Sequence, residues 1–394
     1  MSRTALILSG GGARGAYEVG VLSYVFDHFA RVRRRDPKID LVLGTSVGAI
    51  NGCFLASHLS DAPLGTRRLA NLWSDIHMDE VLRFGPSQMA ALPRLLRGGG
   101  TDGTGVFDVT PMARLVEREV HWRSISRAFR DRRLLGLAVS ATELQSGRTT
   151  VFMQTAPDVG YPTSMPPRTQ LHKARIGPIH ALASAAIPVL FPPVRVGSRL
   201  FMDGGVRQNT PIAPALRLGA THVFAIGLST EGAEPEVPAA EKPPNVAYVI
   251  GKIMNAFLLD HITSDFEILD RVNSFLDLGT EVYGPGFLDS LNAAAEARGQ
   301  TPMRRVHTLV IRPSEDLGKL AQKNLKSGVL RGGPALRAIL GLLDVGASSD
   351  ADLASYLLFD GAFARRLIEL GRADAEQKRT EIDRFFESAE SDPA

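Results

Sequence analysis

The pentapeptide Gly-Thr-Ser-Val-Gly at residues 44–48 constrains this chain more than any other feature. It follows the apolar run at 40–43, which has the length and content of a buried strand. A serine between two glycines at the end of such a strand is typical of a nucleophile elbow, a sharp strand-to-helix turn that exposes the serine hydroxyl. Gly44 and Gly48 permit close packing on both sides of that turn. The pentapeptide, called the elbow below, therefore predicts that Ser46 is a nucleophile.

A second motif, Gly10-Gly11-Gly12-Ala13-Arg14-Gly15, follows an apolar strand predicted at 4–9 and begins a helix. We call it the glycine loop. Its spacing also fits a dinucleotide fingerprint, but that fingerprint needs an acidic residue at the end of the second strand. Here the nearest acid, Asp40, begins that strand instead. Consecutive glycine amides at a helix N-terminus bind other anions as well, so the loop is better interpreted as an oxyanion hole facing Ser46 from the neighbouring parallel strand.

The predicted oxyanion-hole residues are Gly10, Gly11, Gly12, Arg14 and Val47. Val47 is included because its amide begins the helix expected at about 47–58, where the helix dipole favours negative charge. Arg14 either holds the loop or adds positive charge. Gly15 is expected to support the loop.

The sequence does not favour a histidine as the general base. The nine histidines form no local motif, and only one strand and one helix precede Ser46, too few for an ordinary α/β-hydrolase. His28, His58 and His77 are expected on helix surfaces. Asp203 is the candidate base because it ends a short apolar strand, and the next two residues, Gly204 and Gly205, allow close backbone approach. The alternative is an ordinary hairpin aspartate, since Asp-Gly is a frequent turn signal.

Composition narrows the class of protein. The 394 residues are 44% hydrophobic and 22% charged with a net charge of +3, which is typical of a globular protein and gives no reason to expect nucleic-acid binding. Basic stretches at 31–35 and 123–133 are either a solvated face or a contact for an anionic membrane. Cys53 is the single cysteine, so no internal disulfide is expected. We expect a cytoplasmic protein, with peripheral membrane contact and oligomeric state left open.

Short apolar strands alternate with helical patterns, which favours a parallel sheet covered on both faces. The strands are expected at 4–9, 39–44, 134–142, 149–154, 200–203, 221–228 and 306–311, and the main helices at 13–30, 47–58, 62–77, 178–187, 211–218 and 246–276. We divide the chain into a catalytic domain at 4–229, a proline-rich linker or loop at 230–245 and a mainly helical region at 246–394.

The segment 78–107 lacks periodicity and mixes leucines with Arg83, Arg94 and Arg97 before a glycine-rich run. Such a mixture suits docking to a lipid surface. The alternative is that its leucines pack on the core. Whether the segment is a lid is left open.

With Ala183-Ser184-Ala185-Ala186-Ile187-Pro188, the glycine loop, the elbow and Asp203-Gly204-Gly205 occur in an order that resembles bacterial members of the patatin-like phospholipase family. The resemblance covers about 4–228. It implies an α/β protein with three α/β/α layers and a mainly parallel central sheet, followed by a helical C-terminal region. It also implies a Ser46–Asp203 dyad, no metal or cofactor, and acyl-ester lipid substrates. The expected function is a serine lipid acyl hydrolase of the phospholipase A or lysophospholipase type. A lipid acyltransferase and a non-catalytic lipid-binding regulator are the alternatives.

Overall fold

The computed structural model describes residues 2–83, 105–230, 261–300, 302–326 and 352–391. Most of the expected docking segment at 78–107, nearly all of the expected linker at 230–245 and the first part of the expected helix at 246–276 lie outside these residues.

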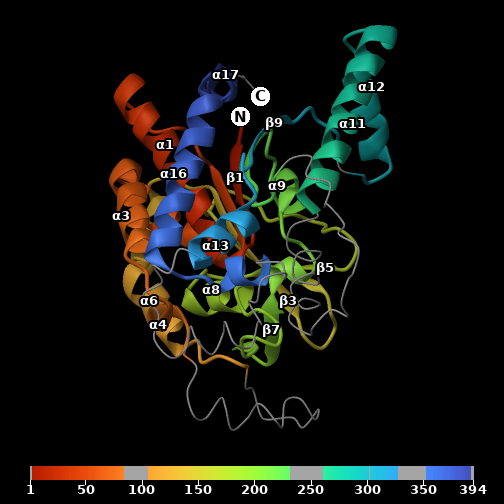
Figure 1. The fold of residues 1–394 in the computed structure, drawn as a ribbon. Helices are drawn as coiled ribbons and strands as arrows, with labels where there is room; N and C mark the ends of the chain where they lie inside the picture. The colour runs from red at the N-terminus through yellow and green to blue at the C-terminus, as the bar shows by residue number, and fades with distance from the viewer. Residues whose placement is uncertain (1, 84–104, 231–260, 301, 327–351, 392–394) are drawn as a thin grey trace, which may run out of the picture.

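A nine-stranded, mainly parallel sheet forms the centre of the molecule (Figure 1). Its main strand order is β5-β4-β3-β2-β1-β8-β9. In this order β3, β2, β1, β8 and β9 pair in parallel, whereas β3 and β4 form an antiparallel hairpin. The strands are β1 (Thr4–Leu8), β2 (Leu41–Thr45), β3 (Gly136–Glu143), β4 (Thr149–Thr155), β5 (Thr169–Lys173), β6 (Val194–Val196), β7 (Arg199–Asp203), β8 (His222–Ile226) and β9 (His307–Ile311). The expected mainly parallel sheet is confirmed.

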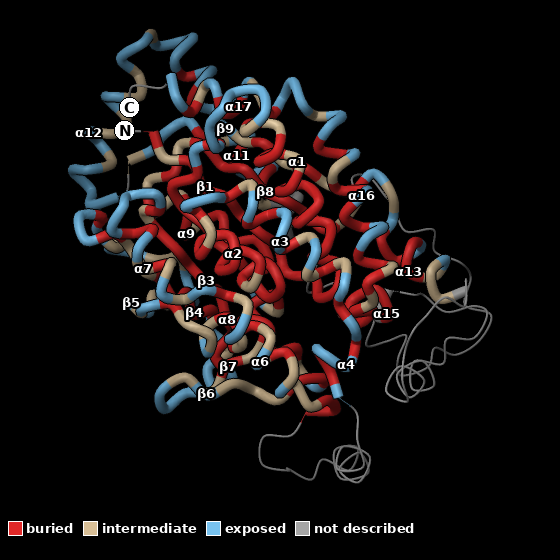
Figure 2. Tube along the Cα trace, turned by 90° about the vertical axis from the view of Figure 1, so that its left-hand side faces the viewer, coloured by how far each residue is buried: buried red, intermediate tan, exposed pale blue. Residues whose placement is uncertain are grey.

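Helices cover both faces of this sheet, as the alternation of side chains along a strand requires. Leu6 and Leu8 of β1 pack with one group of helices, whereas Ala5 and Ile7 pack with the other. Figure 1 shows α1, α3 and α16 on one side of the sheet and α9 and α11 on the other, and Figure 2 shows buried central strands beneath exposed outer helices. The three-layer α/β/α architecture is confirmed.

The helices have the following bounds: α1 (Ala16–Val32), α2 (Val47–Ser57), α3 (Ala62–Ser74), α4 (Met78–Val81), α6 (Thr110–Glu119), α7 (Trp122–Arg130), α8 (Pro178–Ser184), α9 (Ile212–Arg217), α11 (His261–Tyr283), α12 (Phe287–Ala297), α13 (Leu317–Lys326), α15 (Asp352–Leu357), α16 (Gly361–Gln377) and α17 (Arg379–Ser391). Two short 3₁₀ turns, η1 (Gly12–Gly15) and η2 (Gly204–Val206), carry parts of the motifs. None of the helices in the described ranges is both long and apolar enough to cross a membrane.

The C-terminal helices α16 and α17 share one hydrophobic core with β1, α1 and α2. Helix α16 packs along α1, and at Gly371 an added Cβ would lie 2.3 Å from the carbonyl oxygen of Tyr17. The Tyr17 hydroxyl also donates a 2.9 Å hydrogen bond to Asp374 of α16. The expected helical character of this region is confirmed, and its close packing ties α16 to the helix that follows the glycine loop.

Two histidines expected on helix surfaces are partly buried instead. Helix α17 covers His28, whose Nε2 lies 2.8 Å from Asp383. The ring of His58 stacks on Phe54 with 4.3 Å between centroids and lies beside His121, which precedes α7. Both predictions were wrong because the covering helices come from distant parts of the sequence.

Candidate active site

The elbow places Ser46 between the end of β2 and the start of α2. Its backbone has φ +55° and ψ −126°, a conformation that a residue with a side chain rarely adopts and that the surroundings must enforce. An added Cβ on Gly44 would lie 2.4 Å from the carbonyl oxygen of Gly48, and one on Gly48 would lie 2.5 Å from that of Leu8. Both glycines are therefore required by close backbone packing, as the motif predicts.

Ser46 and Asp203 are in direct contact. The Ser46 hydroxyl donates a 2.6 Å hydrogen bond to Asp203 Oδ2, and the Gly205 amide donates a 2.8 Å bond to Oδ1. Both dyad side chains are buried, with residue exposures of 2% and 1%. Burial raises the pKa of Asp203 to about 7, although the hydrogen bonds from Ser46 and Gly205 oppose that shift. A carboxylate that takes up a proton near neutral pH is suited to general-base chemistry.

The sheet explains how two residues 157 positions apart meet. β3 pairs with β2 over residues 136–140, and its last residues pair with β7 instead, with Ala141 opposite Asp203. Since β4 occupies the other edge of β3, β7 continues along the edge that β2 leaves when the chain turns at Ser46. The end of β7 thus brings the carboxylate to the hydroxyl.

Ser184, in the small-residue motif at 183–188, supports the elbow through two hydrogen bonds. Its Oγ accepts a 2.8 Å hydrogen bond from the Ser46 amide and donates a 2.6 Å bond to the Ser140 carbonyl. The carbonyl of Ala186 accepts a 2.8 Å bond from the Asp203 amide. The same short motif therefore holds both members of the dyad. The sequence indicates the motif but not this role for Ser184.

The glycine loop lies beside Ser46, with one correction to the predicted oxyanion hole. The Gly10 amide donates a 2.8 Å hydrogen bond to Asn209 Oδ1, so it holds the loop and is not available to an oxyanion. The amides of Gly11, Gly12 and Val47 have no hydrogen-bond partner within the described residues. Asn209 was missed because an isolated asparagine far downstream carries no sequence signal.

Gly12 and Arg14 connect the loop to the C-terminal region. Gly12 has φ +57°, and an added Cβ would lie 2.2 Å from the Tyr356 carbonyl oxygen. The Arg14 side chain is buried, donates a 2.7 Å hydrogen bond from Nε to Ser355, and stacks 4.2 Å above the Tyr356 ring. Of the two roles expected for Arg14, these contacts favour holding the loop, and its own amide already donates to Gly11.

The remaining motif glycines provide steric clearance around the dyad. An added Cβ on Gly15 would lie 2.5 Å from Val47 Cγ2, and one on Gly204 would lie 2.2 Å from the Ser140 carbonyl oxygen. Gly205 contributes its amide to Asp203. The structure therefore brings the four predicted motifs together around one hydroxyl.

A mostly apolar cavity of about 290 Å³ opens beside Ser46, Gly12 and Val47. We call it the acyl cavity. It has room for about ten groups of the size of a water molecule. Its apolar lining comes from α2, α3, α4 and α6 and from the segments after α8 and α15: Ile50, Phe54, Leu69, Leu72, Trp73, Ile76, Val81, Met112, Leu115, Val116, Val120, Ala185, Ile187, Phe191 and Phe359. Its exposed part includes Arg68 and Arg118, which both pair with Glu119 at 3.1 and 2.7 Å.

A buried polar cluster lies against this cavity. The Asn51 amide nitrogen donates to Glu18 Oε2 at 2.9 Å and to the Gly15 carbonyl at 3.1 Å, and its oxygen accepts from Trp73 Nε1 at 3.1 Å. Burial raises the pKa of Glu18 to about 8, so this carboxyl is largely protonated at neutral pH. The cluster links the glycine loop, α2 and α3, and no pattern in the sequence indicates it.

Residues 6–216 match the family model described as patatin-like phospholipase, a stretch that contains the glycine loop, the elbow and Asp203. The chain belongs to the patatin-like phospholipase family. Curated relatives of this patatin-like protein include "Probable lipid hydrolase 463L" of Invertebrate iridescent virus 6, 25% identical over 218 residues, which are 54% of this chain and 63% of the relative. Human "Patatin-like phospholipase domain-containing protein 6" is 26% identical over 230 residues, 58% of this chain and 13% of that protein.

An uncharacterized NTE family protein of Mycobacterium tuberculosis is 24% identical over 273 residues, 68% of this chain and 61% of the relative. The patatin-like chain thus spans less than two thirds of each of these three relatives. Among solved structures, human GIVD cytosolic phospholipase A2 in complex with methyl gamma-linolenyl fluorophosphonate overlaps 98% of this chain and 59% of that one, with 12% identity and a TM-score of 0.42. VipD from Legionella pneumophila overlaps 99% and 74% with 12% identity and a TM-score of 0.29.

Proposed function

We propose that this patatin-like protein hydrolyses acyl esters of lipids, as a phospholipase A or lysophospholipase, with Ser46 as nucleophile and Asp203 as general base. The observation that carries the proposal is the buried 2.6 Å hydrogen bond from a strained serine to a carboxylate whose pKa lies near 7. Family membership and the curated relative named as a lipid hydrolase support the same chemistry.

In the first half-reaction Asp203 accepts the Ser46 proton while Oγ bonds to the ester carbonyl carbon. The amides of Gly11, Gly12 and Val47 donate to the resulting oxyanion. The tetrahedral intermediate collapses with loss of the alcohol, which takes the proton from Asp203 and leaves an acyl-serine. In the second half-reaction Asp203 deprotonates a water that attacks the acyl carbon, and Ser46 regains that proton as the fatty acid departs.

The acyl cavity supports a hydrocarbon substrate, because most of the residues that line it are apolar. Burying each methylene of an acyl chain there contributes about 0.8 kcal/mol. We propose that the chain lies along α2 and α3, with the ester carbonyl between Ser46 Oγ and the amides of the glycine loop.

The test combines active-site labelling with product analysis. A fluorophosphonate probe should label Ser46 in the wild-type protein and leave Ser46→Ala unlabelled, and turnover of a phospholipid panel followed by mass spectrometry should release free fatty acid. Transfer of the acyl group to an added alcohol or lysolipid would make the protein an acyltransferase. If the wild-type protein is neither labelled by the probe nor active on any lipid of the panel, the alternative of a non-catalytic lipid-binding regulator would be favoured.

We also propose that the protein is cytoplasmic and contacts membranes peripherally, and that the divisions at 4–229, 230–245 and 246–394 separate the catalytic domain, a connection and a supporting helical region. The centre of the docking segment, 84–104, lies outside the described residues. The described residues on either side of it contribute to the hydrophobic core, since Leu82 and Phe107 are buried. Sedimentation with anionic vesicles, compared between the wild type and a Phe84→Ser/Leu95→Ser double variant, tests the docking segment.

A further inference from the structure

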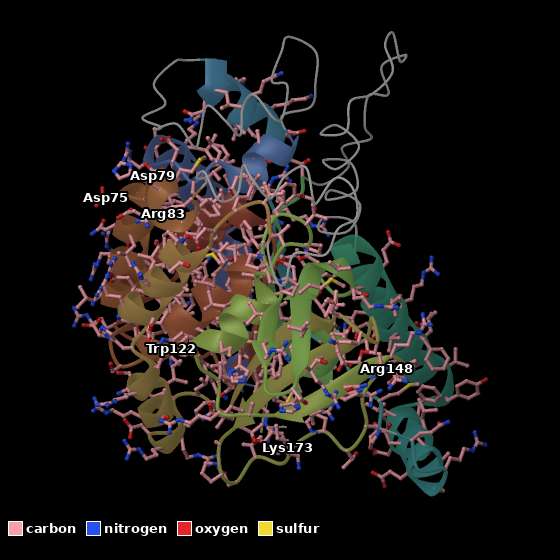
Figure 3. The ribbon with its side chains drawn as sticks, turned by 90° about the horizontal axis from the view of Figure 1, so that it is seen from below. Asp75, Asp79, Arg83, Trp122, Arg148 and Lys173 are labelled. Carbon is pink, nitrogen blue, oxygen red and sulfur yellow. The ribbon has the colours of Figure 1, made fainter. Side chains whose placement is uncertain are left out.

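A second pocket, of about 370 Å³, lies apart from the acyl cavity and shares no lining residue with it. It is formed by the turn between β3 and β4, the start of β5 and the residue after η2. Its lining consists of Ser146, Gly147, Arg148, Arg168, Thr169, Gln170 and Arg207. In Figure 3, Arg148 lies beside the β-strands on the opposite side of the view from Asp75 and Asp79.

The charges in this pocket are unbalanced. Three arginines line it and no acidic residue does. Within the described part of the chain, the guanidinium groups of Arg148, Arg168 and Arg207 form no ion pair, whereas the neighbouring Arg199 lies 3.2 Å from Glu143. All three arginines are exposed, and three positive charges on one lining with no acidic residue create a positive potential that attracts anions.

Glu143, an acidic residue adjoining the pocket, already binds Arg199 and Ser146. Its Oε1 pairs with Arg199, and its Oε2 accepts a 2.5 Å hydrogen bond from the Ser146 hydroxyl. It is also buried and has an exposed fraction of 6%. Among the described residues, Glu143 therefore supplies no negative charge to the three arginines, and a ligand is a source of the charge that they lack.

Hydrogen bonds fix the backbones of the three arginines. The carbonyl of Arg148 accepts from Glu143, the carbonyl of Arg168 accepts from Thr149 at 3.1 Å, and the amide of Arg207 donates to Gly204 at 3.0 Å. The side chains thus project from a fixed frame, which reduces the entropy lost when they order around a ligand.

Phosphate is the anion that this set of donors suits best. Guanidinium groups donate paired N–H groups that match phosphate oxygens, and three of them can surround one phosphate. The hydroxyl of Thr169 and the amide of Gln170 add neutral hydrogen-bonding groups on the same lining.

The pairing of β7, β3 and β4 places this pocket close to Asp203. Ala141 pairs with Asp203 on one side and with Thr150 on the other, so these three residues form a row across β7, β3 and β4. With strands spaced by about 4.8 Å and a rise of about 3.3 Å per residue, the backbones of Arg148 and Asp203 are about 12 Å apart. Arg207 follows Asp203 by only four residues.

We propose that Arg148, Arg168 and Arg207 form a phosphate-binding pocket beside the active site, distinct from the acyl cavity and from the oxyanion hole. Its ligand carries a phosphate group with exposed oxygens, either free in solution or on a lipid headgroup at the membrane surface. Binding of free phosphate is independent of the proposed function, whereas preference among lipid substrates rests on it.

The test uses the full-length protein and inorganic phosphate, followed by calorimetry. The pocket variant carries Arg148→Gln, Arg168→Gln and Arg207→Gln. The matched control carries Arg271→Gln, Arg298→Gln and Arg384→Gln, which removes the same charge from exposed positions on α11, after α12 and on α17, outside the two basic stretches. We expect the wild type and the control to bind phosphate and the pocket variant to bind at least about tenfold more weakly, since charge-assisted hydrogen bonds are lost. Circular dichroism confirms that each variant is folded.

A second arm identifies the source of the phosphate. Vesicles of phosphatidylcholine are compared with vesicles containing phosphatidic acid, an exposed phosphomonoester, or phosphatidylglycerol, which has the same sign of charge but no phosphomonoester. Selective binding to phosphatidic acid that the pocket variant loses and the control keeps assigns a lipid headgroup, and binding of inorganic phosphate alone assigns a free phosphate.

Equal losses in both variants would overturn the proposal, because they would reflect general surface charge. Absence of binding to millimolar phosphate and to all vesicles would overturn it as well. Because Ser46→Ala leaves the pocket intact, phosphate binding by that variant separates a failure of this proposal from a failure of the catalytic one.

Discussion

The protonation of Asp203 sets a sharp expectation for the pH dependence of catalysis. In its proposed role as general base it must be ionised, and its pKa lies near 7 because the carboxyl is buried beside Ser46. Below that value the ionised fraction falls tenfold per pH unit. At about pH 5 only about one carboxyl in a hundred is ionised, so kcat/KM should be about 100-fold below its plateau. The assay is hydrolysis of a short water-soluble ester, which avoids pH effects on lipid packing.

The refuting result is a kcat/KM that stays flat between about pH 5 and 8, as a carboxyl of ordinary pKa near 3.9 would give. Asp203→Asn is the control, since it should be inactive throughout this range. Residual activity near that of the wild type in a folded Asp203→Asn protein would remove the carboxylate from the mechanism altogether.

The same shift predicts the pH dependence of stability. Because the folded-state pKa of Asp203 is raised from 3.8 to about 7, its contribution to stability is fully present below the lower value and is lost as the pH rises through the higher one. Three pKa units correspond to an upper limit of about 4 kcal/mol. Asp203→Asn cannot ionise, so in urea unfolding it should be more stable than the wild type at about pH 8, and the difference should vanish near pH 4. A difference of the opposite sign would contradict the burial argument.

Four further changes test the site. Ser46→Ala should abolish ester hydrolysis and fluorophosphonate labelling while the circular dichroism spectrum is unchanged. Gly12→Ala should lower kcat by about 10²–10³ with little change in KM, because the new methyl group meets the Tyr356 carbonyl and tilts the loop amides; a rise in KM alone would indicate ground-state binding. Ser184→Ala removes the acceptor of the Ser46 amide and should destabilise the fold by about 1–3 kcal/mol, measured by denaturation. No single His→Ala change among the nine should lower kcat/KM more than about tenfold, and a thousandfold loss at one of them would restore a histidine base.

The motifs were predictable because their causes are local. Gly44 and Gly48 are dictated by backbone packing around one tight turn, and β1 and β2 are short apolar runs that indicate a buried parallel sheet. Asp203 was predictable as a strand-ending aspartate before two glycines. Its contact with Ser46 has no local cause, because it depends on β7 taking the place of β2 along β3.

The residues that support the site were not predictable for the same reason. Ser184, Asn209 and Tyr356 reach the elbow and the glycine loop from 138 to more than 300 positions away, and each is an ordinary residue in its own segment. The assignment of Gly10 to the oxyanion hole failed because the Asn209 side chain occupies its amide. The acyl cavity likewise combines side chains from several helices, which a linear pattern does not reveal.

The contact of Arg14 with Ser355 spans 341 residues, and this separation bears on the order in which the proposed active site is assembled during synthesis. A ribosome adding about 5–20 residues per second needs roughly 17–70 s to travel from the first partner to the second. During that time a nascent chain has Ser46, and later Asp203, without the segment that anchors the glycine loop. Such distant contacts also slow folding, since a long loop must close before they form. The proposed esterase activity should therefore be among the last properties the growing chain acquires, after its sheet has formed.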